Sequence, residues 1–253
     1  MTFEIVTVPC RTDNYAFLVR SGDRTALVDA PETAPIAAAL DARGWGLDEI
    51  WITHHHGDHV EGVDTLRTRF GALVRGNLAD AARLPKLDRP FADGESFTFA
   101  GAPVQVMDVS GHTIGHVALY LPAAQAAFTA DSLMALGCGR VFEGTMDQMW
   151  ASLSTLAALP PETLICSGHE YTQTNGRFAL TIEPENPALQ ARVADIAAAR
   201  ARGEATVPSL LSLELATNPF LRAGLAEVKS ALNMAGDSDA AVFAEIRRRK
   251  DSF

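Results

Sequence analysis

Cysteines and long apolar segments are both scarce in this sequence. Its three cysteines, Cys10, Cys138 and Cys166, are scattered and form no Cys-x-x-Cys pair, which indicates reduced thiols rather than a disulfide framework. No run reaches the roughly 18 apolar residues of a membrane-spanning helix. The N-terminus shows no basic segment leading into an apolar run, so we expect no signal peptide. These absences predict a soluble, cytoplasmic protein that does not enter a membrane.

Basic residues are also outnumbered. Lys and Arg total 21 against 31 Asp and Glu, which gives a formal net charge of -10. Because binding of nucleic-acid phosphates needs a basic face, this balance argues against nucleic acid as the main partner. The chain has 253 residues, 47% of them hydrophobic, which is enough for one large core or for a core plus a smaller domain.

Histidines, by contrast, are concentrated in one place. Four of the seven lie in the stretch Thr53-His54-His55-His56-Gly57-Asp58-His59, directly after the apolar run Ile50-Trp51-Ile52. A loop that follows a buried strand is a common place for chemistry. His54 and His56 point to one side of an extended backbone and could bind the same ion. Gly57 lets the chain turn, so that Asp58 and His59 face a second ion position close to the first. Imidazole and carboxylate ligands together suit zinc, iron or manganese.

Three later residues extend this set of candidate ligands. His112 lies in a loop bounded by Gly111 and Gly115, Asp131 ends an apolar run, and His169 follows another. Singly, each also fits an ordinary turn, but their order after the histidine cluster favours a role as ligands. The two oxygens of Asp131 could each bind one ion. We interpret His116 as structural. Asp29, which ends an earlier apolar run, either supports the metal loop or caps a helix.

Hydrophobic periodicity predicts an α/β architecture. We expect helices over 35–43 and 60–70. We expect strands over 3–9, 15–20, 25–29, 50–52, 96–99, 104–107, 117–121, 127–132 and 163–167. This order is typical of two sheets with helices outside them.

Strand signals stop after His169. Asn186-Pro187 predicts a helix that ends before Gly203, Pro208-Ser209 predicts a short helix, and Ser238 predicts the cap of a last one. We therefore expect a β-rich domain over 1–169 and an α-helical appendage over 170–253. The last helix ends in Arg247-Arg248-Arg249-Lys250. These cations either complement the helix dipole, by about 0.3–1 kcal/mol each, or hold a carboxylate-bearing ligand.

The motifs resemble a known family. The histidine cluster resembles the His-x-His-x-Asp-His signature of the metallo-β-lactamase superfamily. The similarity to glyoxalase II, the hydroxyacylglutathione hydrolases, is closer and covers the whole chain. It is carried by the segments 9–15 (PCRTDNY), 128–133 (FTADSL), 137–140 (GCGR), 143–145 (EGT), 166–172 (CSGHEYT) with Asn175, 218–220 (NPF) and 247–253 (RRRKDSF).

This resemblance implies a metallo-β-lactamase-like αββα sandwich with a C-terminal helical domain. It further implies that residues 1–169 are the catalytic domain and residues 170–253 the α-helical substrate-binding domain. It implies hydrolysis of the thioester S-D-lactoylglutathione to D-lactate and glutathione by a metal-bound hydroxide at a binuclear site, in methylglyoxal detoxification. Zinc is the first expectation for the two divalent ions, with iron or manganese as alternatives. One ion would be held by His54, His56 and His112 and the other by Asp58, His59 and His169, with Asp131 bridging; Asp58 and Asp131, with the bridging hydroxide, would be the catalytic groups.

The resemblance also implies how a glutathione thioester, the expected partner of a monomeric enzyme, would be held. The matching positions are Arg140, Tyr171, Asn175, Arg247 and Lys250. Without the family, Arg140 would be interpreted as a solvated side chain and Tyr171 and Asn175 as packing residues. Phe142 departs from the family, which often has an aromatic hydroxyl there. One hydrogen bond to the substrate, worth about 0.5–1.5 kcal/mol, would be lost.

Other functions remain compatible with the motifs. A single-iron persulfide dioxygenase, a lactonase or a β-lactamase could use the same scaffold, but a one-iron enzyme would not need Asp58, His59 and His169. A noncatalytic metal-binding or ligand-binding module is the alternative of a different class. Metal analysis and a thioester hydrolysis assay separate these possibilities.

Overall fold

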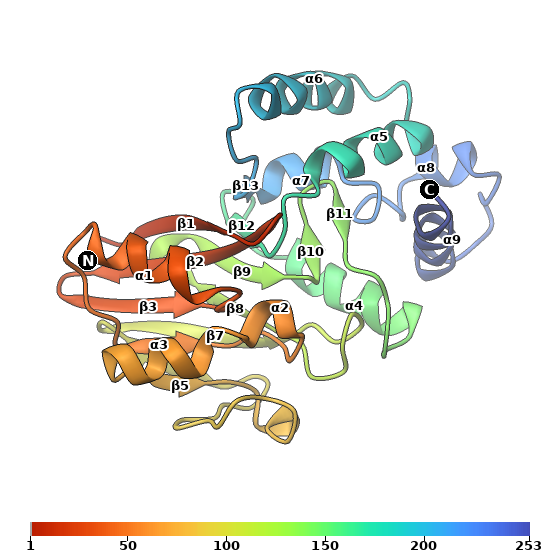
Figure 1. The fold of residues 1–253 in the computed structure, drawn as a ribbon. Helices are drawn as coiled ribbons and strands as arrows, with labels where there is room; N and C mark the ends of the chain where they lie inside the picture. Colours follow the sequence, from red (N-terminus) through yellow and green to blue (C-terminus); the bar gives the residue numbers. More distant parts are fainter. Residues whose placement is uncertain (1) are drawn as a thin grey trace. The chain divides into compact units, whose positions relative to one another are not determined.

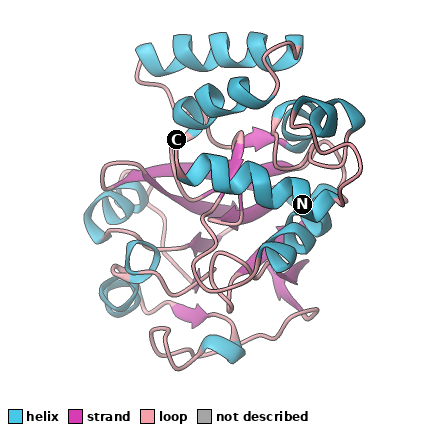
Figure 2. Cartoon of the chain, turned by 90° about the vertical axis from the view of Figure 1, so that its right-hand side faces the viewer, coloured by secondary structure: helices cyan, strands magenta, loops and turns pink. Residues whose placement is uncertain are grey.

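The computed structural model describes residues 2–253, and the chain forms two compact units (Figure 1). The first unit contains the residues up to Asp108 together with Gly115–Ala130. The second contains Val109–Ile114 together with Asp131–Phe253. Strands are prominent in the first unit and helices in the second. Figure 2 shows the helices and strands of the chain in separate colours.

The first unit contains two sheets. Strands β1 to β5 form one sheet in chain order, in which β1, β2 and β3 are antiparallel while β3, β4 and β5 are parallel. Strands β6 to β9 pair antiparallel in chain order. The bounds are β1 (Glu4–Cys10), β2 (Asn14–Ser21), β3 (Arg24–Val28), β4 (Glu49–Trp51), β5 (Leu73–Arg75), β6 (Ser96–Phe99), β7 (Ala102–Asp108), β8 (Val117–Leu121) and β9 (Ala126–Ala130). The helices are α1 (Thr33–Asp41), α2 (Gly57–Val60), α3 (Val63–Phe70) and the short 3-10 turns η1 (Leu78–Asp80) and η2 (Pro122–Ala124).

Alternation along the strands gives the first sheet two buried faces. Leu18 and Ile50 pack in one apolar cluster with Ile36 of α1 and Leu66 of α3, so the helices cover that face. The other face packs on the second sheet through aromatic rings. Phe17 contacts Phe128 at 5.8 Å between ring centroids, and Trp51 meets Phe97 and Phe99 edge-on at 5.2 and 5.1 Å. Because successive side chains of a strand point to opposite faces, a sheet buried on both faces requires apolar side chains at successive positions, as in β2.

The second unit is mainly helical. Its helices are α4 (Met146–Ala157), α5 (Thr172–Ile182), α6 (Pro187–Ala201), α7 (Leu211–Thr217), α8 (Ala226–Ala231) and α9 (Asp239–Asp251). Two short antiparallel pairs accompany them: β10 (Leu133–Met134) with β11 (Gly137–Cys138), and β12 (Leu164–Ser167) with β13 (Ser209–Leu210). Asn186 caps α6 by accepting from Ala188 and Leu189, and Ser238 caps α9 by accepting from Ala241, as the sequence predicted.

Two sequence predictions were wrong in detail, and one helix was missed. The helix expected over 60–70 is two helices, and α2 already begins at Gly57 inside the histidine cluster. Strand structure does not stop at His169, because Ser209 and Leu210 pair with β12 before α7 begins. Helix α4 was not predicted at all, although Thr145 and Gln148 form a capping box at its start. The boundary at 169 and 170 stays a prediction.

Candidate metal centre and substrate-binding residues

Asp29 anchors the histidine loop in the first unit. It follows β3, and its backbone N–H donates to the carbonyl of Trp51 at 2.9 Å, which sets it beside the end of β4. Its carboxylate accepts from the backbone N–H of Thr53 at 2.9 Å and from the Thr53 hydroxyl at 2.8 Å. The adjacent carboxyl ends of two parallel strands are therefore joined by one buried side chain.

Asp29 also orients His59. Its Oδ2 lies 2.8 Å from Nδ1 of His59, whose side chain is fully buried. A carboxylate on Nδ1 favours the tautomer that carries the proton there, so Nε2 presents its lone pair for a metal. The N-cap of α1 is Glu32, not Asp29. Of the two roles that the sequence left open for Asp29, support of the loop is the one observed.

The other histidines of the loop point in two directions, with His54 and His56 close together and His55 turned toward Asp80. Nε2 of His54 lies 3.2 Å from Nδ1 of His56. Donor atoms of Asp29, His54 and His59 all lie within 4.8 Å of one another. His55 instead directs Nδ1 to the carboxylate of Asp80, at 3.2 Å, and is not part of this group. Imidazoles this close cannot all be protonated without repulsion, and a shared divalent cation suits them.

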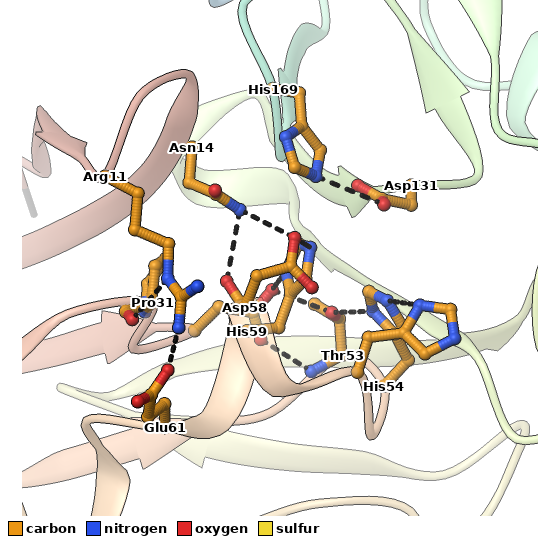
Figure 3. Close-up of polar contacts among 12 residues, drawn as sticks. Arg11, Asn14, Pro31, Thr53, His54, Asp58, His59, Glu61, Asp131 and His169 are labelled. Atoms are coloured by element: carbon orange, nitrogen blue, oxygen red, sulfur yellow. Dashed lines mark hydrogen bonds and ion pairs between the residues drawn. The ribbon is translucent and has the colours of Figure 1, made fainter.

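Asn14 holds Asp58, a contact that the sequence did not reveal. Asn14 begins β2 and is buried, and its Nδ2 donates to the backbone carbonyl of Asp58 at 3.1 Å and to its carboxylate at 3.0 Å. The only signal was its place in the motif of residues 9–15. Two residues beyond the cluster, Glu61 accepts a hydrogen bond from Arg11 (Figure 3).

The later candidate ligands come together inside the second unit. Oδ2 of Asp131 lies 3.5 Å from Nε2 of His112 and 3.3 Å from Nε2 of His169, and all three side chains are buried. Nδ1 of His112 lies 2.8 Å from the carbonyl of Arg140, which again favours Nε2 as the ligand atom. Gly139 makes this possible: a Cβ there would lie 1.9 Å from the carbonyl oxygen of Asp131. The sequence did not identify that glycine as a requirement.

The residues expected to hold the substrate also lie in the second unit. Tyr171 is 40% exposed, and its ring stacks on His169 at 4.7 Å. Phe142 is 60% exposed and meets the ring of His112 edge-on at 5.3 Å. Asn175 is buried and donates to the carbonyl of Ala135 at 3.1 Å. Aromatic surface therefore flanks two of the candidate ligands, while Asn175 already serves the backbone.

The basic run at the end of α9 divides into two pairs. Arg248 and Arg249 are surface residues that pair with Glu245. Arg247 is buried, and its Nη1 donates to the carbonyl of Cys138 at 2.8 Å. The ammonium of Lys250 lies 5.3 Å from the ring centroid of Phe178. Burial, and then the nearby guanidinium of Arg247, lower the pKa of Lys250. Arg247 and Lys250 thus contact other residues of the second unit, so their role is not limited to the helix dipole.

Comparisons with known proteins place this architecture. Residues 11–169 match the metallo-beta-lactamase superfamily, and residues 170–253 match the hydroxyacylglutathione hydrolase C-terminus. A hydroxyacylglutathione hydrolase of Ruegeria pomeroyi is 63% identical over the full length of both chains. The chain belongs to the hydroxyacylglutathione hydrolase family. The expected metallo-β-lactamase fold with a C-terminal helical region is confirmed.

Solved structures agree with this fold. ETHE1 from Myxococcus xanthus superposes with a TM-score of 0.67 at 23% identity, covering 98% of this chain and 90% of the other. TTHA1623 in a di-iron-bound form superposes with a TM-score of 0.57 at 27% identity, covering 66% of this chain and 91% of the other. Among residues 2–253, no helix of this hydroxyacylglutathione hydrolase family member is both long and apolar enough to span a membrane.

Proposed function

We propose that the protein hydrolyses S-D-lactoylglutathione to D-lactate and glutathione. The observation that carries this proposal is the match to hydroxyacylglutathione hydrolases over the full chain, because it includes the C-terminal region as well as the superfamily fold. The site residues support it, since the seven candidate metal ligands and the five candidate substrate-binding residues stand at the family's positions in this sequence, while Phe142 departs from the family.

We further propose which residues hold two divalent ions. His54, His56 and His112 would bind one, Asp58, His59 and His169 the other, and Asp131 would bridge them. The donor chemistry fits, because each histidine with a carboxylate or carbonyl on Nδ1 presents Nε2, and because the second unit already gathers two imidazoles on one oxygen of Asp131. Zinc is the first candidate, and iron or manganese suit the same ligands; the di-iron form of TTHA1623 shows that a relative of this fold holds a metal pair. When bound, such ions would supply an activated water and polarise the thioester carbonyl.

The chain's own groups would then position the reaction. Asp29 would orient the proposed ligand His59 through its Nδ1, and Asn14 would orient the proposed ligand Asp58 by donating to its carboxylate. The leaving group is a thiol with an ordinary pKa near 8.5, so it can depart without a strong general acid. Tyr171, Asn175, Arg140, Arg247 and Lys250 would hold the glutathione part.

The cysteines do not suit nucleophilic catalysis. Burial raises the pKa of Cys10 to about 12 and that of Cys138 to about 11, and burial also raises the pKa of Cys166. A thiol must ionise to attack a thioester. We therefore propose direct hydrolysis without an acyl-cysteine. We also propose a cytoplasmic monomer whose partner is a small glutathione thioester and not a nucleic acid.

Replacing Asp131 with Ala tests the bridging role. The variant should lose activity by roughly a thousandfold, the order expected when a main electrostatic contributor is removed, and should bind less metal. Hydrolysis of S-D-lactoylglutathione and metal content per chain are the measurements. Asp195→Ala, on the exposed face of α6, is the matched control and should behave as wild type. Full turnover by the Asp131→Ala variant with two ions bound would refute the bridging role of Asp131. A metal-loaded wild type that hydrolyses no glutathione thioester would refute the proposed function.

A further inference from the structure

One carboxylate, Asp251, is shared by two arginines that come from distant segments. Its Oδ1 accepts from Nη2 of Arg247 at 2.9 Å and from Nε of Arg247 at 3.2 Å. The same oxygen lies 3.4 Å from Nε of Arg140. Asp251 is the last residue of α9, and its side chain is 31% exposed. A single oxygen therefore partly neutralises two guanidinium groups.

The two arginines depend on Asp251 to different degrees. Arg247 has independent support, because its Nη1 donates to the carbonyl of Cys138 and its guanidinium lies 5.2 Å from the ring centroid of Phe220. The side chain of Arg140 is 57% exposed, and its ion pair with Asp251 holds it against α9. The guanidinium of Arg140 also lies 5.8 Å from the ring centroid of Phe142, which is itself exposed. Removing the carboxylate would therefore leave Arg247 in place and loosen Arg140.

Positive charge exceeds negative charge in this cluster. Arg140, Arg247 and Lys250 surround one carboxylate, on a chain whose formal net charge is -10. Arg247 and Arg177 both act electrostatically on Lys250 to favour its neutral form, whereas Asp251 favours its charged form. A second anion would be attracted here, and Asp251 would compete with it for the same guanidinium donors.

We propose that Asp251 is an internal competitor for the carboxylate end of the substrate. It occupies Arg140 while the site has no ligand, and the ligand carboxylate takes its place on that guanidinium. The competition weakens retention of glutathione, which the reaction releases, so Asp251 favours product release over tight binding. The inference rests on the proposed function, because it takes the ligand to be a glutathione thioester.

Asp251→Asn tests the competition with little change in shape. Glutathione should bind the variant roughly threefold to tenfold more tightly, because a unit negative charge beside the ligand carboxylate is removed. Calorimetric titration with glutathione and product inhibition by glutathione are the measurements, and affinity should fall more steeply with salt than in wild type. KM should fall, and kcat should fall or stay the same because product leaves more slowly.

Two further variants make the result specific. Glu245→Gln removes one negative charge from the same helix but pairs with Arg248 and Arg249, so it should leave glutathione affinity nearly unchanged. In an Arg140→Met background, Asp251→Asn should gain much less affinity, since the shared donor is gone. Asp251→Glu keeps the charge and should stay near wild type.

The outcomes separate this inference from the function. Unchanged or weaker glutathione binding by a folded Asp251→Asn variant, in an enzyme whose wild type binds glutathione and hydrolyses the thioester, overturns the competition and leaves the function standing. Weaker binding would mean that Asp251 only orients Arg140. A wild type that neither binds glutathione nor hydrolyses the thioester would sink both proposals.

Discussion

At the scale of single residues, buried partners make the proposed ligands usable. Asp29 has a backbone φ of 55°, a left-handed conformation that Asp and Asn tolerate better than most residues. From that position its carboxylate reaches Thr53 and His59 together. The left-handed backbone conformation of Asp29 accompanies its contacts with Thr53 and His59. Through the contact with His59, the carboxylate sets the tautomer of the imidazole.

Asp29→Asn should therefore lower metal affinity without unfolding the protein. Asparagine accepts the same backbone conformation. The substitution removes the charge behind His59 and leaves a single accepting oxygen for the donors of Thr53 and His59. Loss of such an outer partner typically lowers metal affinity by about 10- to 100-fold. Competition with a chelator measures the affinity, and urea unfolding checks stability. Asp29→Ala is the comparison and should also lose stability, because alanine is strained at this φ; equal metal affinity in Asp29→Asn and wild type would contradict the role.

At the scale of elements, a buried ion pair shapes the β10–β11 hairpin. Glu214 of α7 is fully buried, pairs with Arg192 of α6, and accepts from the backbone N–H of Leu136 at 2.8 Å. Asn218 donates to the carbonyls of Met134 and Gly137 on the same hairpin. The segment that leads to Gly139 and Arg140 thus takes its shape from helices that come much later in the sequence.

Glu214→Gln should destabilise the protein strongly. It leaves the guanidinium of Arg192 buried without its counter-charge, which typically costs about 3–5 kcal/mol. The free energy of unfolding, from urea titration, is the measurement. Glu204→Gln is the matched control, since Glu204 pairs with Arg202 at the surface and its loss should go undetected. A change in Glu214→Gln no larger than in the control would show that the buried pair is not needed.

At the scale of the whole molecule, all three thiols lie inside an acidic protein. Cys10, Cys138 and Cys166 form no disulfide and are buried in residues 2–253. Burial favours their neutral form, so each has a higher pKa folded than unfolded, where the ordinary value is 9.0. The thiols should therefore make the stability of the whole protein depend on alkaline pH.

The free energy of unfolding should fall as pH rises above 9. Below pH 9 the thiols are protonated in both states and their contribution is fully present. Above it the unfolded thiols ionise first, so each thiol should cost about 1.4 kcal/mol per pH unit until its folded pKa is passed, near 12 for Cys10. Urea unfolding between pH 8 and 11 measures this. The decline should be shallower in Cys10→Ala, and native thiols should resist iodoacetamide at pH 8; rapid alkylation of the folded protein would contradict the burial.

Features that depend on near neighbours could be predicted from the sequence alone. The caps at Asn186 and Ser238 and the order of the strands follow from residues a few positions apart. The candidate ligands could be named because strand ends carry them in a recognisable order, and the resemblance supplied the substrate class. Their assignment as ligands stays a prediction.

The side chains that support those candidates could be identified only in the folded chain. Asn14 reaches Asp58, Asp29 reaches His59, and Asp251 reaches Arg140 across long stretches of chain. Such pairs depend on strand register and helix packing, which bring together residues whose own neighbourhoods look ordinary. A hydrogen bond of about 3 Å is a short-range interaction, so its partners are fixed by the folded path of the whole chain and not by local sequence.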